Sequence, residues 1–267
     1  MNPGNEDFTA RLEHIRNVFN KRRFVRPDPL QFLYEYPAAD DREICGMIAS
    51  SLAFGRVDQI LKAVDRVLDV MGPHPRHYIE AGSFSDFDHD FEGFQYRFVK
   101  GRQVAEMCKG LKHVIQTFGS LNECFRQGFS HNDETVLPAL SFMTARISEH
   151  ADPGYLLACP EKGSACKRSL LYLRWMVRCD DVDPGGWTGV APCLLLVPLD
   201  THMHRICRKF GFTDRRQADM KAALQATRSL RKFAPDDPVC YDFSLTRFGI
   251  HPDFDMESLA RLFPDQV

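Results

Sequence analysis

The sequence lacks three features that would each define a class of protein. No run of apolar residues approaches the roughly 18 that a membrane-spanning helix needs. The polar, acidic N-terminus has no apolar segment of the kind that forms a secretory signal. The nine cysteines are an odd number without the spacing of a disulfide framework. These absences predict a cytoplasmic protein that keeps its cysteines reduced and does not engage a membrane.

An excess of charge of either sign is missing as well. Lysine and arginine number 34 against 36 acidic residues, so the formal net charge is −2, which does not indicate a nucleic-acid partner. Basic residues nevertheless gather in two stretches, within 162–178 and 205–216. Such clusters suit contacts to phosphate groups, although a solvated helix face produces the same pattern.

Strand-like alternation is sparse, and nearly every segment has the apolar spacing of an amphipathic helix. Residues 84–100, rich in aromatic and acidic side chains, instead predict an insertion or irregular connection. We find no internal repeat or long linker. The sequence therefore predicts an all-α fold, one bipartite domain over residues 1–267. In it, residues 1–39 pack as an N-terminal extension on a core of residues 40–250, with a substrate cleft between the two halves.

The most informative segment is VPLDTHMHRICRKFG, residues 197–211. Asp200 or Thr201 is placed to cap a helix that Gly211 ends. Free amide groups and the helix dipole favour the charged form of a carboxylate at such a position. The segment therefore predicts a fixed carboxylate at a helix N-terminus, for which an ordinary N-cap is the simpler interpretation.

This segment resembles the P-x-D-T-H-x-x-R-[IV]-C motif of the helix-hairpin-helix DNA glycosylases of the endonuclease III type, through Pro198, Asp200, Thr201, His202, Arg205, Ile206 and Cys207. The resemblance implies that Asp200 is the catalytic carboxylate and that His202 and Arg205 lie beside the DNA. A fixed carboxylate stabilises the positive charge that develops on the sugar when an N-glycosidic bond breaks.

Residues 155–178 predict a helix, a glycine-containing turn and a second helix, which resembles the helix-hairpin-helix of that superfamily. Of its L-P-G-[IV]-G-x-[KT]-x-[AS] pattern, the proline, one glycine and a lysine are present. The backbone amides of such a turn bind a DNA phosphate. In the same superfamily the turn at residues 50–56, which includes Arg56, faces the extruded nucleotide. The resemblance thus implies DNA contacts in the hairpin by Lys162, Gly163, Ser164 and Arg168.

Lys167 is the candidate nucleophile of a bifunctional enzyme. In such glycosylases a neutral lysine amine attacks the sugar and forms a Schiff base, after which the strand can be cleaved. Lys167 precedes Asp200 by 33 positions, a separation similar to that in the archaeal type of 8-oxoguanine glycosylase. The register of the hairpin stays open, because aligning Gly163 with its last glycine moves the lysine position to Ala165.

Two further segments carry resemblances. Residues 167–187 resemble the signature of a bacterial family of conserved hypothetical proteins, and with the Asp200 segment and the end of the chain the likeness covers most of residues 40–250. VCYDFSLTRFG, residues 239–249, resembles the last core helix of endonuclease III, which four cysteines holding an iron–sulfur cluster follow. Since no cysteine follows Cys240, we expect no iron–sulfur cluster and no other cofactor.

Three aromatic residues and two histidines are candidate site residues. Three aromatic side chains could stack on an extruded base, although core packing is the alternative for each: Phe54, Trp175 and Trp187. His202 and His204 are separated by two positions and point to different sides of a helix, so we expect no metal there.

Together these features predict a DNA glycosylase, with or without AP-lyase activity, that removes a damaged base such as an oxidised purine. We expect it to bind DNA and to be a monomer. A non-catalytic DNA- or RNA-binding protein is the alternative, favoured by the departures in the hairpin and by the slightly negative charge. A metal-dependent hydrolase using His202 or His204 is a third, weaker hypothesis.

Overall fold

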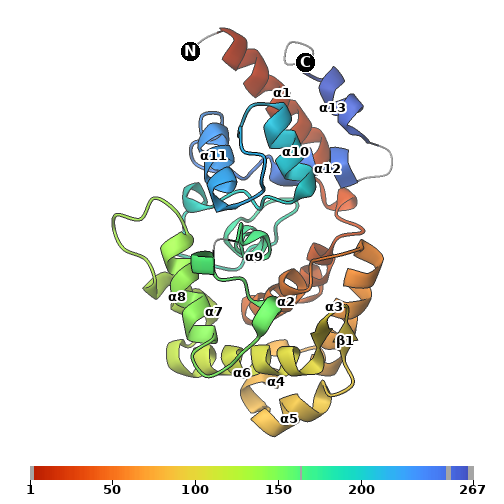
Figure 1. Ribbon diagram of the computed structural model, residues 1–267, viewed down its shortest axis with the longest axis vertical. Helices are drawn as coiled ribbons and strands as arrows, with labels where there is room; N and C mark the ends of the chain where they lie inside the picture. Colours follow the sequence, from red (N-terminus) through yellow and green to blue (C-terminus); the bar gives the residue numbers. More distant parts are fainter. Residues whose placement is uncertain (1–2, 163, 251–253, 264–267) are drawn as a thin grey trace.

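The computed structural model describes residues 3–162, 164–250 and 254–263 and is predominantly helical, so the prediction of an all-α protein is confirmed (Figure 1). Its α-helices are α1 (Pro3–Phe19), α2 (Ala39–Ser51), α3 (Val57–Met71), α4 (Pro75–Ala81), α5 (Phe84–Asp90), α6 (Gly101–Phe118), α7 (Leu121–Gln127), α8 (Leu137–Ile147), α9 (Lys167–Val177), α10 (Thr201–Lys209), α11 (Met220–Leu230), α12 (Asp242–Ile250) and α13 (Met256–Arg261). Short 3-10 helices and one hairpin complete the described part: η1 (Arg22–Phe24), η2 (Pro29–Glu35), η3 (Gly154–Leu156), η4 (Pro160–Lys162), η5 (Pro192–Leu194), β1 (Gln95–Tyr96) and β2 (Val99–Lys100).

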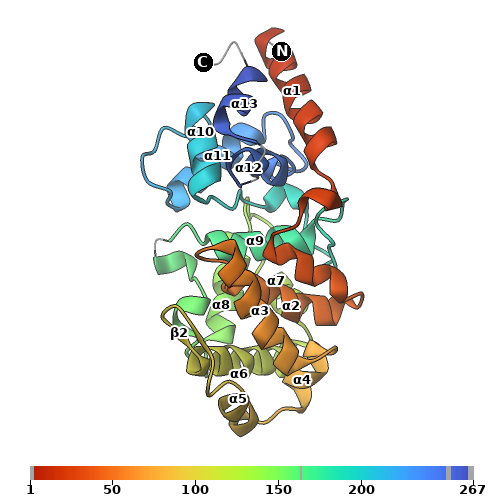
Figure 2. The same cartoon turned by 90° about the vertical axis from the view of Figure 1, so that its right-hand side faces the viewer.

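The elements form two groups along the long axis of the molecule, with α9 between them (Figures 1 and 2). One group contains α2 to α8, and the other contains α1 and α10 to α13. Helix α1 packs on α12, so the first and last helices of the chain belong to the same group. None of the described helices combines the length and apolar composition that a membrane crossing requires.

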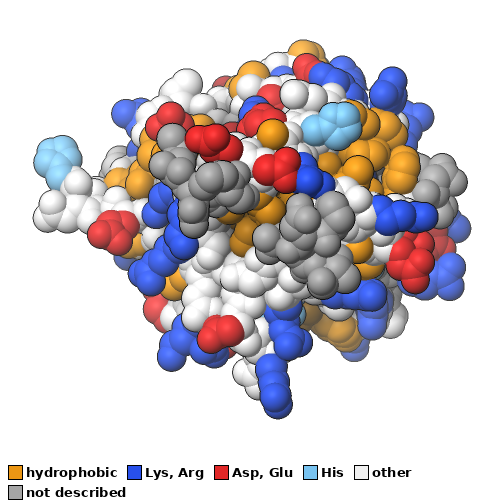
Figure 3. Space-filling view, turned by 90° about the horizontal axis from the view of Figure 1, so that it is seen from above, with side chains coloured by type: hydrophobic (Ala, Val, Ile, Leu, Met, Phe, Trp, Pro, Cys, Tyr) orange, Lys and Arg blue, Asp and Glu red, His pale blue; other side chains and the backbone are white. Residues whose placement is uncertain are grey.

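The end of the molecule at which both chain termini lie carries basic and acidic side chains close together (Figure 3). Lys and Arg side chains lie around much of its edge, with Asp and Glu side chains between them.

Helix α9 owes its central place to its side chains, because seven of its eleven residues are buried. Two buried arginines at its C-terminal end, Arg174 and Arg178, share the carboxylate of the fully buried Asp183. Arg174 also pairs with Asp242 of α12, and Arg178 pairs with Asp237 at 2.9 Å. This set of residues, with Asp180 bound to Arg178 at 2.7 Å, is called the arginine network below.

The segment 84–100, predicted to be irregular, forms helix α5 and the antiparallel β1–β2 hairpin instead. Ser83 caps α5 by accepting a hydrogen bond from the Asp86 amide, and the Ser83 amide donates to the Asp86 carboxylate, so an aspartate that made the segment look irregular also helps to start a helix. Gly101 permits the hairpin to close, since a Cβ there would lie 1.6 Å from the Phe91 carbonyl oxygen.

We predict that Asp183→Ala lowers the free energy of unfolding by about 3 to 5 kcal/mol, because it leaves two buried guanidinium groups without their shared carboxylate. Asp181→Ala is the matched control: Asp181 lies in the same loop, but its ion pair with Lys21, at 2.7 Å, is exposed and should contribute at most about 1 kcal/mol. Urea unfolding of the two variants measures the difference. Equal losses would contradict the role given to the network.

Candidate active site

The two candidate catalytic side chains, far apart in the sequence, lie together in the structure. Lys167 is the first residue of α9, and Asp200 is the N-cap of α10. The Lys167 Nζ atom lies 3.7 Å from Asp200 Oδ2, and the two side chains are 34% and 19% exposed. Asp200 Oδ1 accepts a hydrogen bond of 2.7 Å from the Met203 amide. One carboxylate oxygen is thus fixed by the helix while the other faces the lysine.

The chain before each helix directs these side chains. Cys166, buried and in the left-handed conformation at φ 48°, turns the backbone immediately before Lys167, and its amide bonds to Ser164 Oγ at 3.2 Å. On the other side, the buried Val197 is held by its amide, which donates to Thr227 Oγ1 at 3.0 Å. Both residues of the pair therefore follow segments that are anchored in the core.

The pair stands where two cavities meet. The first, of about 460 Å³, is lined by the side of α12 that faces α9 and is called the α12 cavity. The second, of about 650 Å³, is lined by η3 and the residues before α9 and is called the η3 cavity. Lys167, Asp200 and Thr201 line both cavities, as do Ala53 and Phe54 of the turn between α2 and α3. Volumes of this size suit a small ligand or an extruded group.

A buried carboxylate faces the α12 cavity beside the pair. Asp242 is 2% exposed; its Oδ2 accepts from Arg174, whereas its Oδ1 has no hydrogen-bond partner in the described residues. Burial raises the pKa of Asp242 to about 6; the Arg174 charge opposes this shift, and the nearby Asp200 adds to it. The cavity thus contains one carboxyl group that changes its charge close to neutral pH.

Sequence reasoning did not select Asp242, Arg174 or Arg247 as site residues. Arg247 is 3% exposed, lines the α12 cavity and lies 3.6 Å from the carboxylate of Asp28. Charged residues inside the otherwise apolar segment 239–249 were the signal that could have found two of them. For Arg174 the signal was its spacing, because Lys167, Leu171 and Arg174 recur at i, i+4 and i+7 and line the cavity together.

Several predicted DNA-binding residues lie around the cavities. Arg56, at the start of α3, is 85% exposed beside the turn that lines both cavities and pairs with Asp58 at 3.3 Å. His202 lines the α12 cavity, and Arg205 is exposed on α10. Ser164 lines the η3 cavity. Gly163 and the side chain of Lys162 lie outside the described residues.

The local fold before α9 differs from the predicted hairpin. Two short 3-10 helices, η3 and η4, stand where an α-helix was expected. Pro153 precedes η3 and Pro160 begins η4, and a proline inside an α-helix removes a backbone donor and clashes with the preceding turn. The segment 154–162 therefore cannot continue as one regular helix.

Arg168 was expected to hold a phosphate; each of its two terminal nitrogens donates to the protein itself, and the phosphate contact stays a prediction. Its guanidinium donates to the carbonyl oxygens of Ser51 and Tyr155, and lies 4.3 Å from the Tyr155 ring centroid and 5.2 Å from that of Phe54. Burial lowers its pKa. Arg168 thus joins the end of α2 to η3, and these two carbonyl groups would compete with a phosphate for its donors.

Two of the three aromatic residues assigned to a base pocket lie elsewhere, so that assignment is wrong for them. Trp175 is fully buried within the core. Trp187 packs against Phe125 and Tyr172, with ring centroids 5.2 Å away in each case, and its Nε1 donates to Glu43 at 3.0 Å. Neither lines a cavity beside the Lys167–Asp200 pair, whereas Phe54 lines both.

The histidines divide into separate environments. His204 Nε2 bonds to the Arg215 carbonyl oxygen at 3.0 Å, while His202 lies against Gly249, so the two rings do not converge. The absence of a metal there stays a prediction.

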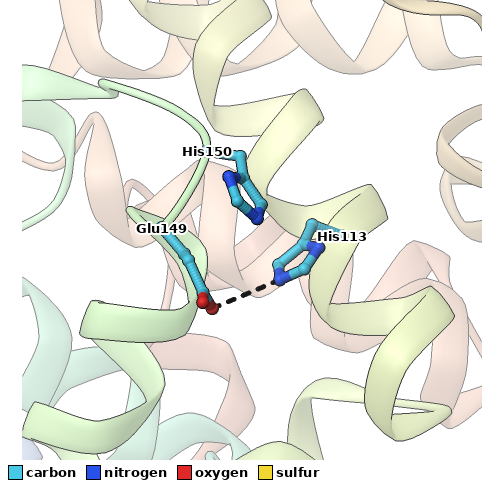
Figure 4. A group of neighbouring side chains, drawn as sticks. All are labelled: His113, Glu149 and His150. Atoms are coloured by element: carbon cyan, nitrogen blue, oxygen red, sulfur yellow. Dashed lines mark ion pairs between the residues drawn. The ribbon is translucent and has the colours of Figure 1, made fainter.

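A second group, whose members line neither cavity, is formed by His113, Glu149 and His150, each with a nitrogen or oxygen atom within 4.8 Å of those of the others (Figure 4). Glu149 Oε2 bonds to Arg146 at 2.9 Å and lies 3.4 Å from His113 Nε2. These contacts explain the arrangement without a bound ion.

Comparison with known proteins places the chain in a family. It belongs to DUF2400, a family of proteins of unknown function whose model matches residues 28–251. Neither the comparison with curated proteins nor that with solved structures found a match. The matched region includes the Lys167–Asp200 pair and Asp242.

We predict that Asp242 makes stability depend on pH. Its pKa is about 6 in the folded protein against a usual value of 3.8, so between these values the folded state binds more protons than the unfolded state. The free energy of unfolding therefore falls as pH rises through this window, by about 3 kcal/mol for this one group. Asp242→Asn keeps the neutral shape and lacks the titration.

Urea unfolding of wild type and Asp242→Asn at a series of pH values from about 4 to 7 measures this contribution. The stability of the variant relative to wild type should increase steadily with pH. A difference between the two proteins that does not change with pH would contradict the raised pKa.

Proposed function

We propose that this protein is a DNA glycosylase of the helix-hairpin-helix type that acts as a monomer on a damaged base, with Asp200 as its catalytic carboxylate. The observation that carries the proposal is the 3.7 Å approach of Lys167 Nζ to Asp200 Oδ2 where two cavities meet. The sequence resemblance had assigned catalytic roles to the same two residues, which lie on different helices.

The geometry suits cleavage of an N-glycosidic bond. When that bond breaks, its electron pair leaves with the base and positive charge develops on the sugar. Asp200 Oδ2 is available to stabilise this charge, because Oδ1 is already held by the Met203 amide and the carboxylate does not have to reorganise. Without a nucleophilic lysine, a water molecule beside Asp200 completes the reaction and yields an abasic site.

Lys167 adds a lyase step to this proposal. Its amine must lose a proton before it attacks the sugar C1′ atom, and Asp200 Oδ2 is close enough to accept that proton after a small movement. Attack forms a bond from Nζ to C1′ as the bond to the base breaks. Nζ then loses a proton and the C1′–O4′ bond breaks as O4′ takes up a proton, which gives the Schiff base. Proton loss from C2′ then expels the 3′ phosphate and cleaves the strand.

We expect Asp200→Asn to lower the rate of base release by at least about a hundredfold, because the charge opposite the sugar is lost. DNA affinity and fold should persist, since Asn is an equally good N-cap. Asp219→Asn is the matched control: Asp219 caps α11 in the same way, with Oδ1 2.9 Å from the Ala222 amide, but lines neither cavity. Single-turnover assays on duplexes containing 8-oxoguanine, uracil or hypoxanthine measure base release as alkali-labile sites.

Base release by Asp200→Asn at the wild-type rate would overturn the mechanism. Binding of DNA by wild type without release of any base would favour the alternative, a DNA-binding protein that has the fold without the reaction.

Borohydride trapping tests the lyase step. Wild type should form a covalent adduct with an abasic duplex, and Lys167→Ala should form none, because the Schiff base needs the Nζ atom. Lys209→Ala, which removes an exposed lysine at the end of α10, should retain the adduct. An adduct of undiminished yield in Lys167→Ala would assign the nucleophile to another residue.

A further inference from the structure

Exposed aromatic rings gather beside the η3 cavity. Phe98 and Tyr155 are 53% and 50% exposed, although large apolar side chains are usually buried. Their ring centroids are 4.6 Å apart, and Phe98 stacks on Phe54 at 5.4 Å with an interplanar angle of 21°. Phe54 and Tyr155 both line the η3 cavity with Lys167 and Asp200. The three rings, called the aromatic rim below, therefore adjoin the candidate active site.

The rim is held in place by the β1–β2 hairpin, whose two-residue turn is Arg97 and Phe98. The Tyr96 hydroxyl of β1 donates to the Phe54 carbonyl oxygen. Gly55 lets the hairpin approach this closely, because its φ of 99° favours glycine and a Cβ there would lie 2.9 Å from the Tyr96 hydroxyl. The exposed ring of Phe98 is thus fixed on the turn that lines both cavities, which reduces the conformational entropy that it would lose on binding.

Cationic side chains lie on the elements that form the rim. Arg97 and Lys100 of the hairpin are exposed, and Arg56 follows the turn on which Phe98 rests. Arg168 lies under the rim, 4.3 Å from the Tyr155 ring centroid. The aspartates of segment 84–100 lie on α5, outside the turn, whereas Asp58 pairs with Arg56 at 3.3 Å. Fixed aromatic rings among positive charges are the surface that proteins use to stack bases of a nucleic acid while its phosphates are neutralised.

We propose that Phe98, on the β1–β2 hairpin, stacks on an unpaired DNA base next to the nucleotide that enters the active site. This inference rests on the proposed function, because it presumes DNA at the Lys167–Asp200 pair. Extrusion of a nucleotide removes a stacking partner from its neighbours. The Phe98 ring replaces that partner, and Phe54 and Tyr155 support the ring from behind.

The test is the affinity for a duplex that contains a stable tetrahydrofuran abasic site, measured by fluorescence anisotropy against the fully paired duplex. Phe98→Ala should weaken binding to the abasic duplex by about tenfold, the range of one base–aromatic stack, and affect the paired duplex less. Phe98→Leu should lose as much, because it is apolar without a π face, and Phe98→Trp should restore the affinity. The salt dependence should not change, since no charge is removed.

Phe84→Ala is the matched control, because Phe84 is also half exposed but lies on α5, outside the rim, and this variant should bind like wild type. Wild-type affinity in Phe98→Ala or in Phe98→Leu would overturn the stacking role and leave the glycosylase proposal standing. Equal losses of affinity for both duplexes, together with a lowered melting temperature of the variant protein, would also overturn the stacking role. Failure of wild type to bind any duplex would overturn the proposed function and the inference with it.

Discussion

The buried arginine network is the constraint on which the rest of the structure depends. Arg174 and Arg178 extend from the end of α9 into the core, where the fully buried carboxylate of Asp183 contacts both. Charges without water need a partner in correct geometry, so α9, α12 and the loop after α9 can be assembled in few ways. The active-site candidates follow from this arrangement, because Lys167 begins the helix that Arg174 fixes, and Asp242 begins α12.

The network also shapes the chemistry of the α12 cavity. Arg174 uses one nitrogen for Asp183 and another for Asp242, so its charge is divided between two carboxylates. Asp242 therefore remains incompletely compensated, with Oδ1 unpartnered, and its pKa rises because of burial. Arg174 thus stabilises the core through Asp183 and also holds the titratable Asp242 in the cavity that Asp200 lines.

Local patterns predicted part of the local structure. Apolar spacing predicted a helical protein, and the residue types at Asp200 to Gly211 predicted an N-cap that the structure contains, whereas helix α5 and the 3-10 helices η3 and η4 were not predicted. The pairing of Lys167 with Asp200 came from a family resemblance, since no local rule joins residues 33 positions apart. Asp183 and Asp242 could not be assigned as partners of Arg174, because long-range ion pairs leave no periodic signal. The assignment of Trp175 and Trp187 to a base pocket was wrong for a related reason, because residue type alone does not distinguish a tryptophan in the core from one that lines a pocket.

The net charge of the chain also does not describe its surface, because it counts buried and exposed charges alike. The arginine network contains four aspartates, Asp180, Asp183, Asp237 and Asp242, against two arginines, a formal excess of −2 that equals the net charge of the whole chain. Asp183 and Asp242 are buried with the arginines they neutralise, and so they contribute little to the field that a ligand meets. Around the aromatic rim, Arg97 and Lys100 are instead exposed. A slightly acidic total is therefore compatible with exposed cations on the β1–β2 hairpin, because a net charge does not say where on the surface the charges of each sign lie.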